Sequence, residues 1–378
     1  MNNVIYLDHN ATTPIRPAVA AAVVEALSVY GNASSVHEFG RRAKRVLEDA
    51  REQVAALVRV RPSQVIFTSG GTEANNLAVR GARVSQVFAS GIEHVSVLQA
   101  AENLTPIPVD AGGRLHVDAL AEMLKPGSGQ RPDQVLVSVM YANNETGVLQ
   151  PVQDVADVCQ ANGALFHCDA IQAAGKVPLD FADTGADLLS LSAHKIGGPQ
   201  GVGALIVRDD IRIMPTSRGG GQELRRRAGT ENLAGIAGFG VAAELAVPGV
   251  DENSRLAALR DQLEARLHAL APVQVFGADH ARLGNTSCLS MPGVDAETQI
   301  MGLDIAGVAV SAGSACSSGK VEPSHVLQAM GIDARIARTA IRISFGWTSL
   351  DADVGRLVEA WADIYHRAGS VRPAAMAS

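Results

Sequence analysis

Residues 64–80 read QVIFTSGGTEANNLAVR, and the order of residue types in this stretch decides the fold. The apolar run at 64–68 is typical of a buried strand, and residues 73–80 have the character of a helix. Residues 69–72 between them are small and turn-forming. A strand that passes through a tight turn into a helix is the repeating unit of a sheet flanked by helices.

The same alternation continues through the first two-thirds of the chain. Residues 152–160 place apolar side chains at i, i+3, i+4 and i+7 on one helical face, and Gly163 is suited to the end of that helix. Further apolar runs predict strands at residues 135–140, 164–168, 187–191 and 203–207. We therefore predict an α/β protein with a mainly parallel sheet flanked by helices.

The pattern changes near residue 250. Residues 251–271 are typical of a long, charged amphipathic helix, and strand-like segments follow at 273–276 and 286–291. A closing helix is predicted over about 350–366. We expect a large domain of residues 16–250, a small α+β domain built from residues 1–15 and 251–368, and a flexible tail at 369–378.

Composition excludes several classes of protein. With 378 residues, of which 47% are hydrophobic and 19% charged, the chain can bury a large core. Its 32 basic and 39 acidic side chains give a net charge of −7, which argues against a general nucleic-acid binder. No charge-free stretch approaches the roughly 20 apolar residues of a membrane helix, and no secretory-signal pattern is visible at the start. We expect a cytoplasmic protein without membrane or direct nucleic-acid contacts.

The four cysteines, Cys159, Cys168, Cys288 and Cys316, lie far apart and form no C-x-x-C pair. A disulfide framework would be unusual in so long a chain, which favours a reducing compartment. The first two fall on apolar faces of a predicted helix and strand, and Cys288 lies within a predicted strand, so these three are interpreted as packing residues. No set of ligands stands at metal-binding spacing beside them, so no metal is predicted.

Three features stand at the carboxyl ends of predicted strands, where open α/β sheets bind ligands. The first is Gly70-Gly71-Thr72, whose small residues and following helix could bind an anion through free N–H groups. The same residues could be a tight turn with Thr72 as the helix N-cap. The turn alone leaves both interpretations open.

The second and third features are charged residues. Asp169 ends an apolar strand and is either a turn residue or the partner of a cationic ring nitrogen. Lys195 follows Ser192-Ala193-His194 and precedes a glycine-rich loop. A lone lysine in a turn is usually solvated, but burial near positive charge would lower its pKa and make it a Schiff-base nucleophile.

Taken together, the three features resemble the fold-type I enzymes that use pyridoxal 5′-phosphate (PLP), and finer motifs resemble the cysteine desulfurases of the NifS/IscS type. The resemblance runs over about residues 4–365 with the motifs in the family's order. It is carried by LDHNATTP at 7–14, TSGGTEANN at 68–76, NNETG at 143–147, SAHK at 192–195, GGGQE at 219–223 and SAGSAC at 311–316. It implies the PLP-dependent transferase fold, with the Cys316 loop carried by the small domain, and a homodimer.

The resemblance also implies a role for each matching residue around the PLP ring. Lys195 would bind PLP as a Schiff base, and Asp169 would pair with the ring nitrogen. His94 would stack on the ring and move protons. Gln172 would donate a hydrogen bond to the phenolate oxygen of the ring.

Further residues would hold the two anionic groups. The resemblance assigns the PLP phosphate to Gly71, Thr72, Ser192 and His194, with Thr230 reaching the phosphate of the partner subunit. It assigns the substrate carboxylate to Asn143 and Arg342, and an arginine fork is well shaped for that group.

Several of these residues also have an ordinary interpretation. On spacing alone His94 would be a partly buried histidine, Asn143 a turn former and Arg342 a surface residue of a strand. The run Arg225-Arg226-Arg227 is usually a solvated face, although at a dimer interface it would supply positive potential. His9-Asn10 could line the site, but the sequence assigns neither residue a role.

Cys316 separates the expected reaction from other PLP chemistry. It lies in SAGSACSSG at 311–319, where small residues leave a thiol accessible instead of packed among large apolar neighbours. A thiolate there could attack the sulfur of bound L-cysteine, become a persulfide and pass the sulfur to an acceptor, leaving L-alanine. The alternative is an ordinary loop that happens to contain a cysteine.

The sequence therefore predicts a PLP-dependent L-cysteine desulfurase that passes sulfur to an acceptor such as an iron–sulfur scaffold or a tRNA-thiolation enzyme. Selenocysteine lyase or aminotransferase activity would share Lys195 and Asp169 without needing an accessible thiol. A binding protein that keeps the fold without turnover is the third reading. The sequence does not name the acceptor, and it does not decide between cysteine and selenocysteine.

Overall fold

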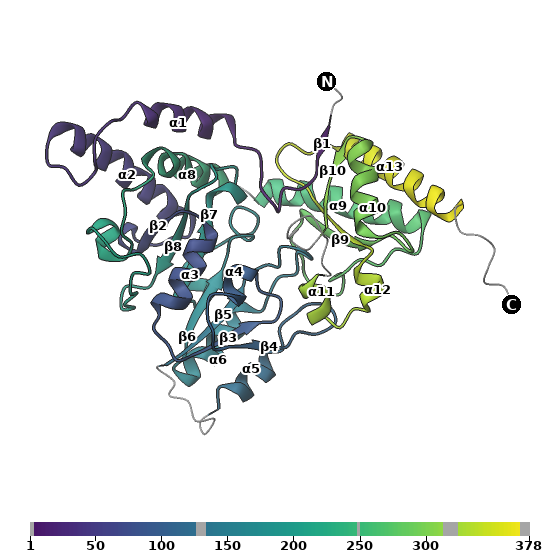
Figure 1. Cartoon of the computed structure of the whole chain (residues 1–378), viewed down its shortest axis with the longest axis horizontal. Coiled ribbons are helices and arrows are strands. Elements are labelled where there is room, and N and C mark those ends of the chain that lie inside the picture. Colours follow the sequence, from purple (N-terminus) through teal and green to yellow (C-terminus); the bar gives the residue numbers. More distant parts are fainter. Residues whose placement is uncertain (1–3, 126–133, 248–249, 313–323, 371–378) are drawn as a thin grey trace.

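The computed structural model describes residues 4–125, 134–247, 250–312 and 324–370, and it is built around a seven-stranded sheet (Figure 1). The strand order is β2-β8-β7-β6-β5-β3-β4. Strands β7, β6, β5, β3 and β4 pair in parallel, whereas β8 runs antiparallel to both β2 and β7. The predicted α/β class with a mainly parallel sheet is thus confirmed. The strands are β2 (Val65–Thr68), β3 (Gln86–Ser90), β4 (Leu104–Ile107), β5 (Val135–Met140), β6 (Leu165–Asp169), β7 (Leu188–Ser192) and β8 (Gly203–Val207).

Helices pack against this sheet and against one another. All six residues of β5 are buried, as expected for a parallel strand that is covered on both faces. Helix α3 packs on β7 and β8, and α8 packs on α1 and α2. These helices are α1 (Pro17–Leu27), α2 (Glu38–Leu57), α3 (Gly71–Gly81), α4 (Val95–Leu98), α5 (Val117–Met123), α6 (Val152–Asn162), α7 (Phe181–Thr184) and α8 (Leu233–Ala246).

Most of the local predictions hold with shifts of one or two residues, although the closing helix continues past the predicted end to Ser370. Helix α3 begins at Gly71, two residues before the predicted start, because Gly70 at φ +151° turns the chain directly into the helix. Helix α6 ends at Gly163, which is left-handed at φ +67° as its residue type predicts. The strand predicted at 273–276 is wrong, since only Val275 forms an isolated bridge, to Leu289.

The C-terminal part has its own small sheets. Strand β12 (Ala340–Ser344) lies between β11 (Ser311–Ala312) and β9 (Thr286–Ser290) in an antiparallel sheet. The N-terminal strand β1 (Ile5–Tyr6) pairs with β10 (Val308–Ala309), and Figure 1 shows these two strands side by side although they are far apart in the sequence. The helices here are α9 (Val250–Leu270), α10 (Ala296–Ile305), α11 (His325–Ala329), α12 (Ala334–Ala337) and α13 (Asp351–Ser370).

A second hydrophobic core holds these elements together. It contains Ile5 and Leu7 from the N-terminal segment together with apolar residues from 256–364, and Trp361 is completely buried at its centre. The segment after β1 then leaves this core and enters the large sheet's side of the molecule, so it bridges both parts. Within the described ranges, none of the helices combines the length and the apolar character that crossing a membrane requires.

Candidate active site

Lys195 lies just beyond the carboxyl end of β7, in a short turn (Ala193–Lys195). Its Nζ donates to the carbonyl oxygens of Asn10 and Ala11. Burial lowers the pKa of Lys195 to about 8, and the charge of Arg342 adds to that lowering. Part of the amine is therefore neutral at pH 7, which is the form that attacks a carbonyl carbon.

Asp169 is the last residue of the neighbouring strand β6, and only 5% of it is exposed. Its carboxylate accepts hydrogen bonds from the backbone N–H of Ile171 at 3.0 Å and from Asn75 Nδ2 at 2.7 Å. Burial raises the pKa of Asp169. A cation beside it would favour the ionised form, so the site suits a protonated ring nitrogen.

His94 precedes helix α4 and caps it. Its Nδ1 accepts from the backbone N–H of Ser96 at 3.1 Å. His94 is exposed in the single chain, yet the protein atoms around its ring partly desolvate it and lower the pKa of His94. Asp169 and Lys195 both contribute to its electrostatic environment, so the structure brings these three predicted residues together.

The predicted phosphate site lies between β7 and the start of α3. Ser192 ends β7, and its buried Oγ has no hydrogen-bond partner among the described residues. A Cβ on Gly71, the first residue of α3, would meet Cδ1 of Ile171, so glycine leaves room here without any shift of the isoleucine side chain. Thr72 beside it is exposed, and His194 Nδ1 lies 3.2 Å from Thr12 Oγ1. An unpaired hydroxyl and the free N–H groups of a helix start form a suitable site for an anion.

Gln172 contacts a lysine that the sequence analysis did not single out. Gln172 Nε2 donates to the Asn10 carbonyl oxygen at 2.9 Å, while its Oε1 accepts from Lys176 Nζ at 2.7 Å. Burial, with the charges of Lys195 and Arg342, lowers the pKa of Lys176 well below its ordinary value. The i, i+4 spacing of Gln172 and Lys176 was the available signal, but a lysine in a turn carries too little information alone.

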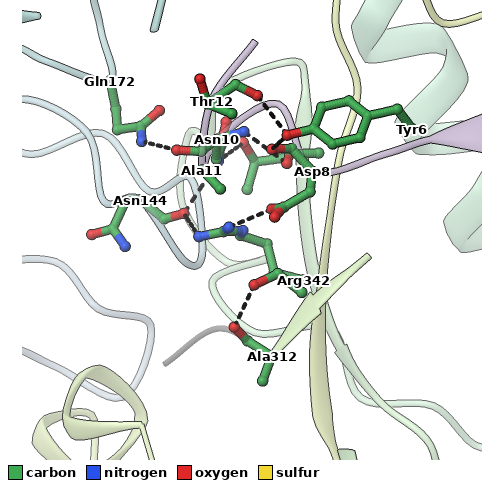
Figure 2. A network of polar contacts seen from close by, with 12 residues as sticks. Tyr6, Asp8, Asn10, Ala11, Thr12, Asn144, Gln172, Ala312 and Arg342 are labelled. Atoms are coloured by element: carbon green, nitrogen blue, oxygen red, sulfur yellow. Dashed lines mark hydrogen bonds and ion pairs between the residues drawn. The ribbon is translucent and has the colours of Figure 1, made fainter. Parts of the chain in front are cut away.

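Arg342 occupies the middle of β12 and is 4% exposed. Figure 2 shows its guanidinium between the N-terminal segment and the turn after β5. Nη2 contacts Asp8 Oδ1 at 2.6 Å, and Nη1 donates to the Asn144 carbonyl oxygen at 3.1 Å. The buried Nε has no partner among the described residues, so donors remain for a carboxylate ligand.

Asn143 is fully buried within the turn that follows β5. Its Oδ1 accepts from the backbone N–H groups of Glu145 and Thr146, both at 2.9 Å, and its Nδ2 donates to the Ile92 carbonyl oxygen at 3.1 Å. The side chain thus shapes the turn, and it is the next residue, Asn144, whose carbonyl oxygen reaches Arg342.

Asn10, which the sequence predicted to line the site but to which it assigned no role, bonds to most of these groups. It is 1% exposed, and its carbonyl oxygen accepts from both Gln172 and Lys195. Its side chain bonds to Lys176 and to residues of β9 and the segment before it. His9 beside it packs against Gly346, where any side chain would collide with the imidazole.

Two predicted residues are not placed with this cluster. Cys316 lies outside the described residues. The described residues on either side of that segment do reach the site, because Ser311 pairs with Arg342 and Ser324 Oγ donates to Glu145 Oε2 at 2.5 Å. Thr230 is exposed in a separate loop.

The other cysteines are structural. Cys159, Cys168 and Cys288 are free thiols and buried, which confirms that they are packing residues. Burial raises the pKa of Cys159 to about 12 and also raises the pKa of Cys168 and Cys288, so none of them is a thiolate at neutral pH. In the part of the chain that the structure describes, no cluster of three or more potential metal ligands occurs.

Comparison with known proteins places the chain in one family. Residues 5–357 match the family model described as aminotransferase class-V. An IscS-like cysteine desulfurase of Mycobacterium tuberculosis is 42% identical over 374 residues, which cover 94% of this chain and 94% of that protein. A cysteine desulfurase of Gluconacetobacter diazotrophicus is also 42% identical, over 98% of this chain and 96% of its own length. A solved structure of a NifS-like protein from Rickettsia africae superposes with a TM-score of 0.89 at 36% identity, covering 96% of this chain and 99% of that one.

Proposed function

Because the chain belongs to the class-V aminotransferase family and, within it, to the cysteine desulfurases, we propose that the site around Lys195 removes the sulfur atom of L-cysteine and leaves L-alanine. The observation that carries this assignment is the meeting of three groups. The buried amine of Lys195 lies within electrostatic reach of both Asp169 and Arg342. An amine, an acid and an arginine so arranged can hold a cofactor and the carboxylate of an amino acid together.

The cofactor is PLP, and the residues present fit it. Ser192 Oγ, which has no partner within the described part of the chain, and the start of α3 at Gly71 offer hydrogen bonds to a phosphate. At the other end, buried Asp169 offers a negative charge to a ring nitrogen. Bound PLP supplies an electron sink for bond changes at the substrate Cα.

The chain's own residues perform the remaining tasks. Lys195 holds PLP covalently and, when released from it, is an amine able to move a proton near neutral pH. Arg342 binds the carboxylate of L-cysteine through its free guanidinium donors, and Asp8 and the Asn144 carbonyl oxygen hold the guanidinium in place. Asn143 supports this site by shaping the turn that presents Asn144.

Cys316 takes the sulfur. Its thiolate forms an S–S bond with the sulfur of the substrate while the Cβ–S bond of that substrate breaks, which leaves a persulfide on the chain. The electron pair of the broken bond stays with the former cysteine, which takes up protons and leaves as L-alanine. The persulfide then passes to an acceptor, such as an iron–sulfur scaffold or a tRNA-thiolation enzyme.

The functional unit in this proposal is a cytoplasmic homodimer. Five large apolar side chains stand exposed on α1, α2 and the segment between them: Val24, Leu27, Tyr30, Val36 and Phe39. Such a patch is typical of a subunit interface. Thr230 would reach the partner's phosphate, and the free buried thiols suit a reducing compartment. The domain boundaries at 16–250 and at 1–15 with 251–368 belong to the same proposal.

The test is to supply the purified protein with PLP, L-cysteine and an excess of a reducing dithiol, which releases the persulfide sulfur as sulfide, and to measure alanine and sulfide together. The proposal predicts that the two products form in equal amounts. L-selenocysteine and a set of amino-acid and keto-acid pairs serve as competing substrates. Transamination without sulfide release would favour an aminotransferase, and turnover of selenocysteine alone would favour a selenocysteine lyase.

A further inference from the structure

The hydrogen bond that caps helix α4 determines where His94 carries its proton. His94 Nδ1 lies 3.1 Å from the backbone nitrogen of Ser96 and accepts its N–H. A backbone N–H can donate but cannot accept. Nδ1 therefore turns a lone pair towards Ser96 and carries no proton.

A second donor reaches the same nitrogen. Ser96 Oγ lies 2.7 Å from His94 Nδ1, and it accepts a hydrogen bond from Asn75 Nδ2 at 3.0 Å. Because the amide of Asn75 occupies a lone pair of the hydroxyl, the hydroxyl hydrogen is free to point at Nδ1. The backbone N–H and the hydroxyl of Ser96 thus both donate to His94 Nδ1.

Asp169 fixes the direction of this chain of hydrogen bonds. Asn75 is completely buried, and its Nδ2 donates to Asp169 Oδ2 at 2.7 Å as well as to Ser96. An ionised carboxylate only accepts, so the amide must turn its nitrogen towards Asp169. Rotating the amide by half a turn would set its oxygen against the carboxylate.

These contacts leave one neutral form for the imidazole. A neutral histidine has one N–H and one lone pair, and the lone pair is on Nδ1, so the proton is on Nε2. Protonating the ring to the imidazolium form would place a second proton on Nδ1, where it would face the two hydrogen-bond donors of Ser96. The pKa of His94 is accordingly lowered, first by burial, with Lys195 and His325 adding to the effect and Asp169 opposing it.

We propose that Asn75 and Ser96 are positioning residues that hold His94 neutral with its proton on Nε2, so that His94 serves the reaction as a hydrogen-bond donor and not as a base. The inference rests on the proposed function only in assigning His94 to that reaction. A neutral imidazole can polarise a substrate in this way. The proton that leaves the substrate then goes to another group, and Lys195 has an amine suited to take it.

The experiment is a long-range ¹H–¹⁵N correlation spectrum of the full-length protein with ¹⁵N in its histidine rings, recorded with and without PLP. The chain has 10 histidines, so the signals of His94 are identified by their loss in His94→Gln. The two neutral tautomers give different patterns of cross-peaks. The Nε2–H pattern, unchanged when PLP is added, is the expected result, and an Nδ1–H pattern would overturn the inference.

Three variants test the part played by Ser96. Ser96→Ala keeps the backbone N–H but loses the hydroxyl donor, so the pKa of His94 should rise, and the acid limb of the kcat/KM profile should move upward with it. Ser96→Thr restores the hydroxyl and should restore both values. Ser85→Ala, at an exposed serine just before β3, is the control. An unchanged His94 pKa in Ser96→Ala would remove Ser96 from the proposal.

The two proposals fail separately. A protein that releases no sulfide but shows the Nε2–H pattern would contradict the desulfurase assignment and leave the tautomer in place. An active desulfurase with the Nδ1–H pattern would support the desulfurase assignment and contradict the proposed tautomer of His94.

Discussion

Opposing influences act on the amine of Lys195. Burial and the charge of Arg342 lower its pKa, while Asp8 and Asp169 raise it, and the result is a pKa of about 8. The two carbonyl oxygens of the N-terminal segment keep the amine in one place. The residue is therefore reactive near neutral pH without being free to move.

This pKa predicts how the protein without PLP recombines with the cofactor. A lysine is neutral above its pKa, so the rate of covalent PLP binding should rise with pH and level off above about 8. Stopped-flow absorbance measures this rate. The control is a free lysine side chain with an ordinary pKa. The rate of its reaction with PLP should keep rising at pH values above 8. A protein that follows the control would show that the burial does not lower the pKa.

Arg342→Lys should impair substrate binding more than the chemical step. Lysine keeps the charge but loses the fork that contacts Asp8, Asn144 and a ligand carboxylate. Losing a charge-assisted hydrogen bond costs about 1.5–3 kcal/mol, which predicts a rise in KM for L-cysteine of roughly tenfold to a hundredfold. Steady-state kinetics measure it. Arg338→Lys, at an exposed ion pair with Asp295, is the matched control and should leave KM unchanged. Equal KM values in both variants would contradict the assignment.

Residue types and order predicted that Lys195 and Asp169 lie close together, because strand ends of an α/β sheet gather at one edge, and the family resemblance added their expected roles. The contacts of Asn10 and Lys176 could not be predicted in this way. Asn10 is separated from Gln172 by 162 residues and from Asn285 by 275, and a single asparagine carries no signal for such distant partners.

At the scale of elements, one buried ion pair fixes the loop at 219–229. Arg51 on α2 makes two hydrogen bonds to Glu223, at 2.8 and 2.9 Å, and Glu223 also accepts from the backbone N–H of Phe67 on β2. Glu223, Leu224 and Arg225 are all left-handed, at φ values of +45°, +55° and +65°. Three such residues in a row are strained, so the ion pair holds the loop against its own backbone preference.

Glu223→Gln should destabilise the protein by about 3–5 kcal/mol, because it removes the buried carboxylate that neutralises Arg51 and leaves this charge with only the half-exposed Glu48 as an ionic partner. Urea denaturation of the PLP-bound protein measures the change in the free energy of unfolding. Glu48→Gln removes the other carboxylate that contacts Arg51, but this one is 45% exposed. That control should lose less than about 1 kcal/mol. Similar losses in the two variants would show that the buried pair does not hold the loop.

Elements with a clear period or a distinct terminator were predicted closely. Gly163 marked the end of α6, and the amphipathic pattern after residue 350 matched α13. Strands β3 and β4 were not predicted, and the latter is partly exposed and carries Pro106. Such a short, mixed segment becomes a strand only because it pairs with β3.

At the scale of the whole molecule, the N-terminal segment connects the seven-stranded sheet with the small sheet β11-β12-β9. Strand β1 pairs with β10, and the residues after it bond to Lys195, Gln172 and Arg342. The segment therefore places Arg342, which belongs to the small sheet, opposite groups that belong to the large one. The sequence motif at 7–14 marked this segment as important, but its position between the sheets required the structure.

The exposed apolar patch predicts how the protein assembles. Leu27→Asp combined with Val36→Asp should separate a dimer into monomers, because these side chains are 71% and 88% exposed in the single chain and a carboxylate cannot be buried there without a partner. Sedimentation velocity measures the change. Met301→Asp with Ile305→Asp, on the equally exposed face of α10, is the control and should leave the dimer intact. If the second pair caused dissociation and the first did not, the interface would lie on the small sheet's side.

In the proposed reaction one thiol, Cys316, receives the sulfur while the other three stay inert in the core. The direct measurement is mass spectrometry of peptides after the PLP-bound protein has reacted with L-cysteine and has been trapped by alkylation. We predict one extra sulfur on the peptide that contains Cys316, alanine in equal amount, and neither in Cys316→Ala, which should still bind PLP. An extra sulfur on Cys159, Cys168 or Cys288, or a wild-type rate of sulfide release from Cys316→Ala, would contradict the account.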